Sequence, residues 1–145
     1  MNSVLDETLE VLWYVDIGSS QCVLVKNLIG EIKLFRDDDI EEAAYKVFTL
    51  RPNYEKLNGQ YETNNGHYFW VVNNKLHNEE RPALRCPDRV MAAITNKYSA
   101  ADNEFFFLYG KLFTKTQWLS WLKDKPNYHK ALAYILASQT TNKTV

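Results

Sequence analysis

Short runs of aromatic and β-branched residues, most of them followed by Asn or Gly, restrict the fold of this chain more than any other feature. The clearest runs cover residues 10–16, 21–26, 31–36, 68–72 and 104–109. Such residues favour strands, whereas Asn and Gly favour tight turns. Because the runs follow one another closely, they predict hairpins rather than parallel βαβ units. We expect an α+β fold: a mostly antiparallel sheet of meanders and hairpins, one internal helix and a C-terminal helical hairpin.

The size of the chain favours one domain, and its charges favour ends of opposite sign. With 145 residues, 46% of them hydrophobic, the chain suits a single domain over 1–145. We divide it into an acidic meander plus helix (1–50), a hairpin-repeat region (58–113) and C-terminal helices (114–138). The first region holds 10 acidic and 4 basic residues, whereas residues 111–145 hold 6 lysines and one aspartate. This difference in charge has two explanations. Either two solvent-exposed faces of the molecule differ in sign, or one end of the chain contacts a charged partner.

A stretch after the third run predicts the internal helix. Its apolar residues repeat with the spacing of one helical stripe, at Ile40, Ala43, Ala44, Val47 and Phe48. Three aspartates, 37–39, precede the stripe, where carboxylates cap a helix and complement its dipole. Carboxylates can also bind Mg²⁺ or Ca²⁺, but the alternating ligands and central Gly of an EF-hand are missing. We therefore expect these aspartates to be structural.

The C-terminal region predicts two helices. Thr114 and Gln117 have the spacing of a capping box, and Pro126 suits the first turn of a second helix. The apolar stripes of the two helices are Trp118, Leu119, Trp121 and Leu122, then Ala131, Leu132, Ile135 and Leu136.

No motif of a known catalytic or metal site occurs in the sequence. Cys22 and Cys86 lie far apart without CxxC or zinc spacing, so we expect reduced structural thiols. No Gly-rich phosphate loop, GxSxG elbow or HExxH is present. We expect a non-enzymatic protein without cofactor or metal. A small enzyme with an unrecognised site is an alternative. The first ten residues lack a basic start and an apolar run, which favours a cytoplasmic location and no membrane span.

Two segments separated by 36 residues resemble each other. Residues 69–77 read Phe-Trp-Val-Val-Asn-Asn-Lys-Leu-His, and residues 105–113 read Phe-Phe-Phe-Leu-Tyr-Gly-Lys-Leu-Phe. Each copy predicts a strand, a two-residue turn and a short return strand. We assign structural roles to the turn residues Asn73, Asn74 and Gly110, and we expect Asn74→Gly to be tolerated because both residues accept a positive φ. His77 is expected to orient the turn through a hydrogen bond.

The first copy resembles a repeat found in many phage and giant-virus proteins, Trp-Tyr-x-Asn-Gly-Lys-Leu-His-Arg-x-Asp-Gly-Pro-Ala. The match keeps the aromatic residue, Asn73, the Lys-Leu-His of 75–77, an acidic residue and the Pro-Ala of 82–83. It departs at Asn74, where the repeat has Gly, and at Glu80 and Arg81, where the repeat has Asp-Gly. The second copy keeps Gly110 and the following Lys-Leu but lacks His and Pro-Ala. The resemblance implies a hairpin array in a viral protein, which would be located in the host cytoplasm. Small phage proteins often bind and inhibit a host enzyme or defence complex, and by analogy we expect this function here.

Aromatic and basic residues interleave in the C-terminal helices and make the candidate binding surface. This surface is Lys115, Trp118, Trp121, Lys123, Lys125, Tyr128 and Lys130. Packing in the core explains the rings most simply, but aromatic residues also dominate protein interfaces. Aromatics beside lysines can instead stack on bases and hold phosphates, which makes nucleic-acid binding the main alternative. The sequence does not indicate the oligomeric state.

Overall fold

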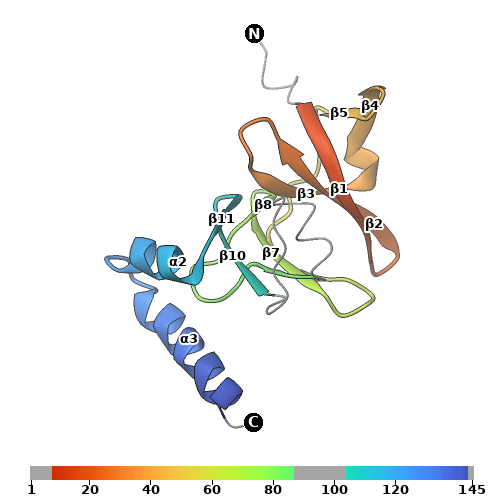
Figure 1. The fold of residues 1–145 in the computed structure, drawn as a ribbon. Coiled ribbons are helices and arrows are strands. Elements are labelled where there is room, and N and C mark those ends of the chain that lie inside the picture. Colours follow the sequence, from red (N-terminus) through yellow and green to blue (C-terminus); the bar gives the residue numbers. More distant parts are fainter. Residues whose placement is uncertain (1–7, 87–103, 144–145) are drawn as a thin grey trace.

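Antiparallel strands pair into one sheet, and two α-helices follow it at the C-terminal end of the chain (Figure 1). The computed structural model describes residues 8–86 and 104–143. Within these ranges the strands are β1 (Thr8–Ile17), β2 (Ser20–Asn27), β3 (Ile32–Arg36), β4 (Ile40–Ala44), β5 (Val47–Leu50), β6 (Gly59–Glu62), β7 (Tyr68–Val72), β8 (Lys75–Leu76), β9 (Leu84–Arg85), β10 (Glu104–Leu108) and β11 (Lys111–Phe113). The helices are a one-turn 3₁₀ helix η2 (Asp37–Asp39), α2 (Lys115–Leu122) and α3 (Tyr128–Lys143).

The sheet confirms the expected α+β class. Its strand order is β11-β10-β9-β7-β8-β3-β2-β1-β5-β4, and β6 pairs with β7 beside this path. The first meander, β1 to β3, and the hairpins of the second half lie where the aromatic runs predict them. The sequence also predicts a strand over residues 90–95, and these residues lie outside the described ranges.

Two strands are buried on both faces, which explains why their sequences are continuously apolar. In β2, Cys22 and Leu24 belong to the main core, whereas Val23 and Val25 pack under β5 on the other face. In β10, Phe105 and Phe107 join the main core, and Phe106 and Leu108 pack against the helices. Since side chains alternate along a strand, a run such as Phe-Phe-Phe-Leu fills two separate cores.

The internal helix expected over residues 37–48 is wrong. Only η2 is helical there, and β4 and β5 form a hairpin that turns at Lys46, where φ is 59°. Phe48 pairs with Leu9 of β1 and packs against the second face of β2, so the hairpin extends an existing sheet. The long-range pairing overrides the helical propensity of the Glu-Glu-Ala-Ala run. Of the three aspartates, Asp39 accepts a hydrogen bond from the Glu55 N–H at 3.0 Å.

The two similar segments form hairpins of the same geometry. Val72 pairs with Lys75 around the first turn, and Leu108 pairs with Lys111 around the second. Both central residues of each turn have positive φ, at 49° and 70° for Asn73 and Asn74. Both turns dock on the edge of β3, where the Ile32 N–H donates to the Gly110 carbonyl at 2.7 Å. The Leu34 N–H donates to the Asn74 carbonyl at 2.8 Å, two residues further along the same strand.

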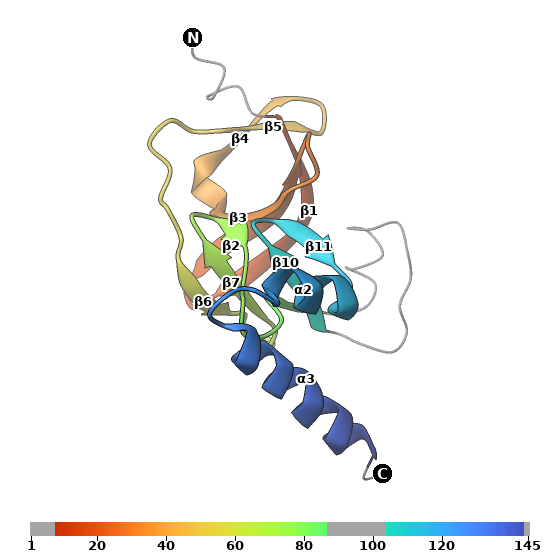
Figure 2. The same cartoon turned by 90° about the vertical axis from the view of Figure 1, so that its left-hand side faces the viewer.

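The two C-terminal helices pack beside β10 and β11 (Figure 2). Thr114 and Gln117 make the expected capping box, in which each side chain bonds the other residue's backbone N–H. Pro126 precedes the first residue of α3 by two positions, and α3 continues to Lys143, beyond the expected end at 138. Both views show α3 projecting away from the sheet. None of the helices in the described ranges is long and apolar enough to cross a membrane.

Candidate functional site

Trp118 lies in the core, so its assignment to the binding surface is wrong. Its side chain is 0% exposed and stacks on Phe106 with ring centroids 4.5 Å apart. Its indole N–H donates to the Asn78 carbonyl at 3.0 Å. Trp118 therefore fastens α2 to the segment that follows the first hairpin. The helical spacing of Trp118 and Trp121 in the sequence does not show which of the two rings faces the core.

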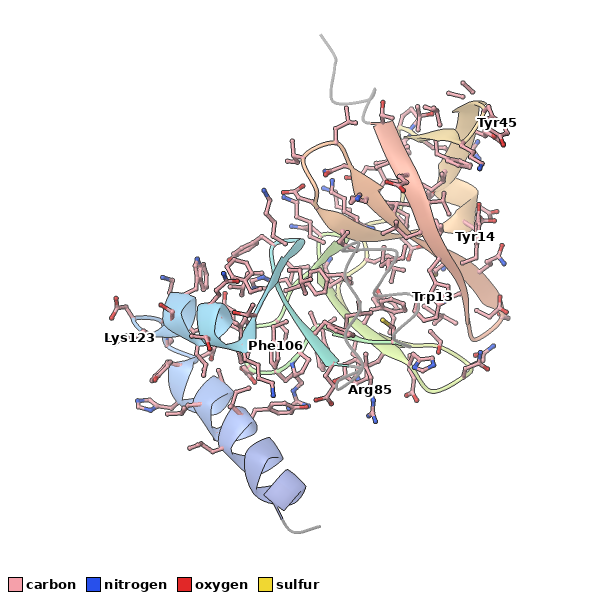
Figure 3. The ribbon with its side chains drawn as sticks, in the orientation of Figure 1. Trp13, Tyr14, Tyr45, Arg85, Phe106 and Lys123 are labelled. Carbon is pink, nitrogen blue, oxygen red and sulfur yellow. The ribbon has the colours of Figure 1, made fainter. Side chains whose placement is uncertain are left out.

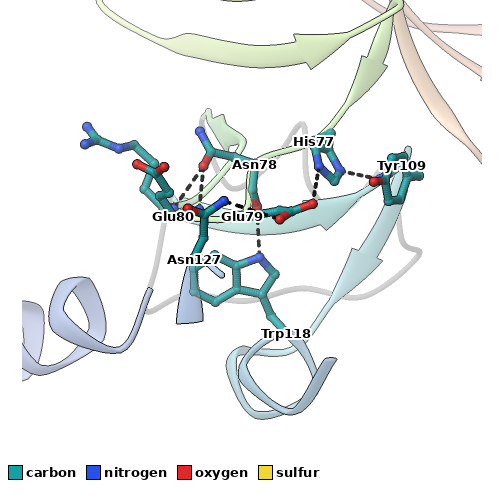
Figure 4. A network of polar contacts seen from close by, with 8 residues as sticks. His77, Asn78, Glu79, Glu80, Tyr109, Trp118 and Asn127 are labelled. Atoms are coloured by element: carbon teal, nitrogen blue, oxygen red, sulfur yellow. Dashed lines mark hydrogen bonds and ion pairs between the residues drawn. The ribbon is translucent and has the colours of Figure 1, made fainter. Parts of the chain in front are cut away.

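His77 connects the two hairpins through its ring (Figure 4). The Tyr109 N–H donates to Nδ1 at 2.9 Å, and Nε2 lies 3.2 Å from a Glu79 carboxylate oxygen. Because a backbone N–H can only donate, Nδ1 carries no hydrogen and Nε2 donates to Glu79. Burial lowers the pKa of His77, although the Glu79 carboxylate opposes this shift. The ring is therefore neutral at pH 7, and its hydrogen bond holds the turn of the second hairpin.

A polar network continues from His77 to the helices. Asn78 accepts at its side-chain oxygen from the backbone N–H groups of Glu80 and Arg81. Asn127, just before α3, donates to Glu79 at 3.4 Å. The segment 77–81 is thereby tied to the second hairpin and to both helices. Both ring nitrogens of the buried His77 are engaged, which leaves no free nitrogen to act on a substrate.

Tyr109 is a candidate contact residue that the sequence analysis missed. It takes the first turn position of the second hairpin with a φ of 50°, where Asn73 stands in the first hairpin. A bulky side chain at positive φ is uncommon and strained. The ring stacks on His77 at 4.1 Å and meets the edge of Trp121 at 6.1 Å, yet it is 50% exposed. The signal was present in the repeat, because aligning the two copies places Tyr where the first copy has Asn.

The expected surface residues divide into two groups. Trp121 and Lys125 come together beside Tyr109, and the Lys125 ammonium lies 4.4 Å from the centre of the Trp121 ring. We call His77, Tyr109, Trp121 and Lys125 the tip cluster.

The remaining members lie apart from this cluster or are already engaged. Lys130 pairs with Glu80 at 3.6 Å, and Tyr128 packs against the helix core. Lys115 is partly buried, and Lys123 is exposed at the end of α2 (Figure 3).

Other titratable groups in the described part of the chain are structural in character. Cys22 and Cys86 are buried cysteines, and burial raises the pKa of Cys22. Tyr134 donates to both oxygens of Glu104 at 2.9 Å, and burial and this carboxylate raise its pKa. Among residues 8–86 and 104–143 no three His, Cys, Asp or Glu side chains gather as metal ligands would.

One pocket lies between β1 and the β6–β7 turn. It is small and polar, and its walls include Trp13, Asp16, Thr63 and Asn64. Asn64 bridges these elements, because its side chain bonds the Gly18 backbone and its N–H donates to the Asp16 carbonyl at 2.9 Å. These contacts close the sheet at this corner and account for the residues there.

Comparison with protein-family models, with curated proteins and with solved structures finds no match to this chain.

Proposed function

We propose that this chain is a non-enzymatic protein-binding module and that its contact surface is the part of the tip cluster formed by Tyr109, Trp121 and Lys125, which the buried His77 supports. The observation that carries the proposal is Tyr109, a large aromatic residue held in a left-handed turn conformation with half of its surface in solvent. Asn or Gly would satisfy this turn without strain. Strained residues persist where a function retains them, which favours a contact role for the ring.

The cluster has the properties of an interface anchor. Tyr and Trp are enriched among the residues that dominate binding energy, because they bury a large area with few rotatable bonds. The Tyr109 backbone is fixed by the His77 ring and by the hairpin, while Trp121 is fixed on α2. A partner would therefore meet rings that are already ordered, which reduces the entropy lost on binding.

The repeat resemblance supports a particular class of partner. If the chain is a viral protein, as the resemblance implies, a host enzyme or defence complex is the partner that a non-enzymatic binding module would meet.

Nucleic-acid binding is supported less well by the same surface. Base stacking needs open ring faces, but Lys125 covers Trp121 and the Tyr109 and Trp121 rings are inclined at 66°.

Affinity capture from nuclease-treated bacterial lysate tests the proposal. The baits are the wild-type chain, Tyr109→Asn and the control Tyr45→Asn. Tyr45 is 82% exposed and lies at the opposite end of the molecule from Lys123, on the β4–β5 hairpin (Figure 3). We expect wild type and Tyr45→Asn to retain the same proteins and Tyr109→Asn to lose them. Retention by all three baits, or capture that depends on nucleic acid, would refute the proposal.

A further inference from the structure

Two aliphatic side chains stand in solvent at the turn between β2 and β3. Leu28 is 83% exposed and Ile29 is 66% exposed. Tight turns usually carry polar residues. A single exposed apolar residue is common on a protein surface, but the fold does not require two adjacent exposed apolar residues at this turn. The turn itself is held by polar groups, because the Asn27 side chain bonds both the backbone and the side chain of Glu31.

This turn lies against the turn that carries Tyr109. The Ile32 N–H donates to the Gly110 carbonyl at 2.7 Å. A Cβ atom on Gly110 would lie 3.0 Å from the Cβ of Glu31. The exposed pair, Leu28 and Ile29, therefore stands on a fixed turn next to the tip cluster, and the two turns offer apolar contacts from two separate hairpins.

The charges around the two turns leave an excess of lysine. Glu31 is paired with Lys75 at 3.2 Å, whereas Glu79 accepts a hydrogen bond from the neutral His77 ring and keeps its negative charge, so Glu79 offsets one of the remaining lysines. Lys111 and Lys125 are exposed, and neither has a carboxylate within 4.0 Å among the described residues. A second copy of this surface would bring like charges together, as would any basic partner. An acidic partner would be attracted, and the pairing of its carboxylates with these lysines would fix its position on the surface.

We infer that the tip cluster and the β2–β3 turn together bind an acidic protein segment that presents apolar side chains. The inference rests on the proposed function and specifies its partner. The apolar residues of the segment contact Leu28, Ile29 and Tyr109, while its carboxylates pair with Lys111 and Lys125. Such lysines chiefly accelerate association, whereas the apolar contacts chiefly control dissociation.

Titration of the ¹⁵N-labelled full chain with three synthetic 12-residue peptides tests the inference. The first has Asp and Glu around a central Leu-Phe pair, the second replaces the acids by Lys, and the third replaces Leu-Phe by Ser-Ser. We expect the first to shift the amides of Ile29, Tyr109 and Gly110 and the indole N–H of Trp121. We expect binding to weaken about tenfold or more for the second and third peptides.

Two matched pairs of variants refine the test. Lys125→Glu should weaken binding of the first peptide about fivefold at low salt, while Lys46→Glu should leave it unchanged. Lys46 is a fair control, because it also lies over an aromatic ring, that of Tyr45 at 5.2 Å. The double variant Leu28→Ser, Ile29→Ser should weaken binding by faster dissociation. Its control is Val47→Ser, which should not weaken binding; Val47 is an exposed apolar residue of the β4–β5 hairpin.

Failure of the inference can be told apart from failure of the proposed function. Equal binding of the lysine peptide, or shifts confined to residues away from the two turns, would overturn the acidic partner. If Tyr109-dependent capture of proteins nevertheless holds, the binding function stands and only its partner chemistry is wrong. Tighter binding of a dT 12-mer than of the acidic peptide would overturn both.

Discussion

Asn74 and Gly110 hold the same position in the two hairpins but support it in different ways. Asn74 is buried, and its amide donates to the carbonyls of Leu34 at 2.9 Å and Glu55 at 3.2 Å. The sequence predicts a positive φ here and therefore suggests that Asn74→Gly is tolerated. The observed φ of 70° agrees with the predicted backbone conformation. The buried amide reverses this expectation, because glycine leaves two carbonyls without their donor.

Asn74→Gly should lower the free energy of unfolding by about 1–2 kcal/mol. The neighbouring Asn73→Gly should leave it unchanged or slightly raised, since Asn73 is exposed and also has a positive φ. Urea unfolding of both variants measures the difference. Equal stability of the two variants would show that the Asn74 amide contributes nothing.

Gly110→Ala should be more destabilising than Gly66→Ala. The two glycines have φ values of 87° and 88°, so an alanine is strained equally at both. A Cβ at Gly66 meets open space, whereas one at Gly110 meets Glu31 at 3.0 Å. We expect an additional loss of about 1 kcal/mol or more at Gly110 in urea unfolding. Equal losses would mean that the two turns are not in contact.

His77 should make stability depend on pH. Burial lowers its pKa in the folded chain, whereas an unfolded His titrates near 6.5. The unfolded state therefore binds the proton first as the pH falls. The contribution of His77 is complete above about pH 6.5 and is lost below it, by at most about 1.4 kcal/mol per pH unit. Wild type and the exposed-site control His129→Gln should lose more stability between pH 7.5 and 5.5 than His77→Gln. Identical losses in the three proteins would contradict this role.

Among the elements, the β4–β5 hairpin differs from the sequence-based expectation, which was a helix. Lys46→Gly gives opposite results for a hairpin and for a helix. In the hairpin turn, glycine relieves the positive φ of 59° and should raise stability by about 0.5–1 kcal/mol. Inside a helix it would lower stability by about 1 kcal/mol. The sign of the change in urea unfolding decides between them.

Strands and caps were predictable from the sequence because their signals are local. β7 spans the predicted residues 68–72, and the capping box at Thr114 and Gln117 begins α2. The segment after β3 was not predictable, since its apolar residues fit a helical period and only pairing with β1 selects the hairpin. For the site, Trp121 and Lys125 were identified, but Trp118 was misplaced because its burial depends on Phe106, a residue of another element.

For the whole molecule, β3 is the strand on which both hairpins meet. Its Ile32 and Leu34 N–H groups bond the turn carbonyls of Gly110 and Asn74, and the His77 network joins the hairpins to the helices. A sheet held in this way is a rigid support for exposed rings at its turns. The residues that hold the scaffold are therefore distinct from Tyr109, which the scaffold exposes at its turn.

The free energy of unfolding of Tyr109→Asn tests this separation most directly. Asn suits the positive φ of this turn position, and half of the Tyr109 ring is already in solvent. We predict that the variant is as stable as wild type or up to about 1 kcal/mol more stable in urea unfolding, while it loses binding. A loss of stability above about 1 kcal/mol, with the Tyr45→Asn control unchanged, would show that Tyr109 holds the fold together and would contradict its assignment as the contact residue.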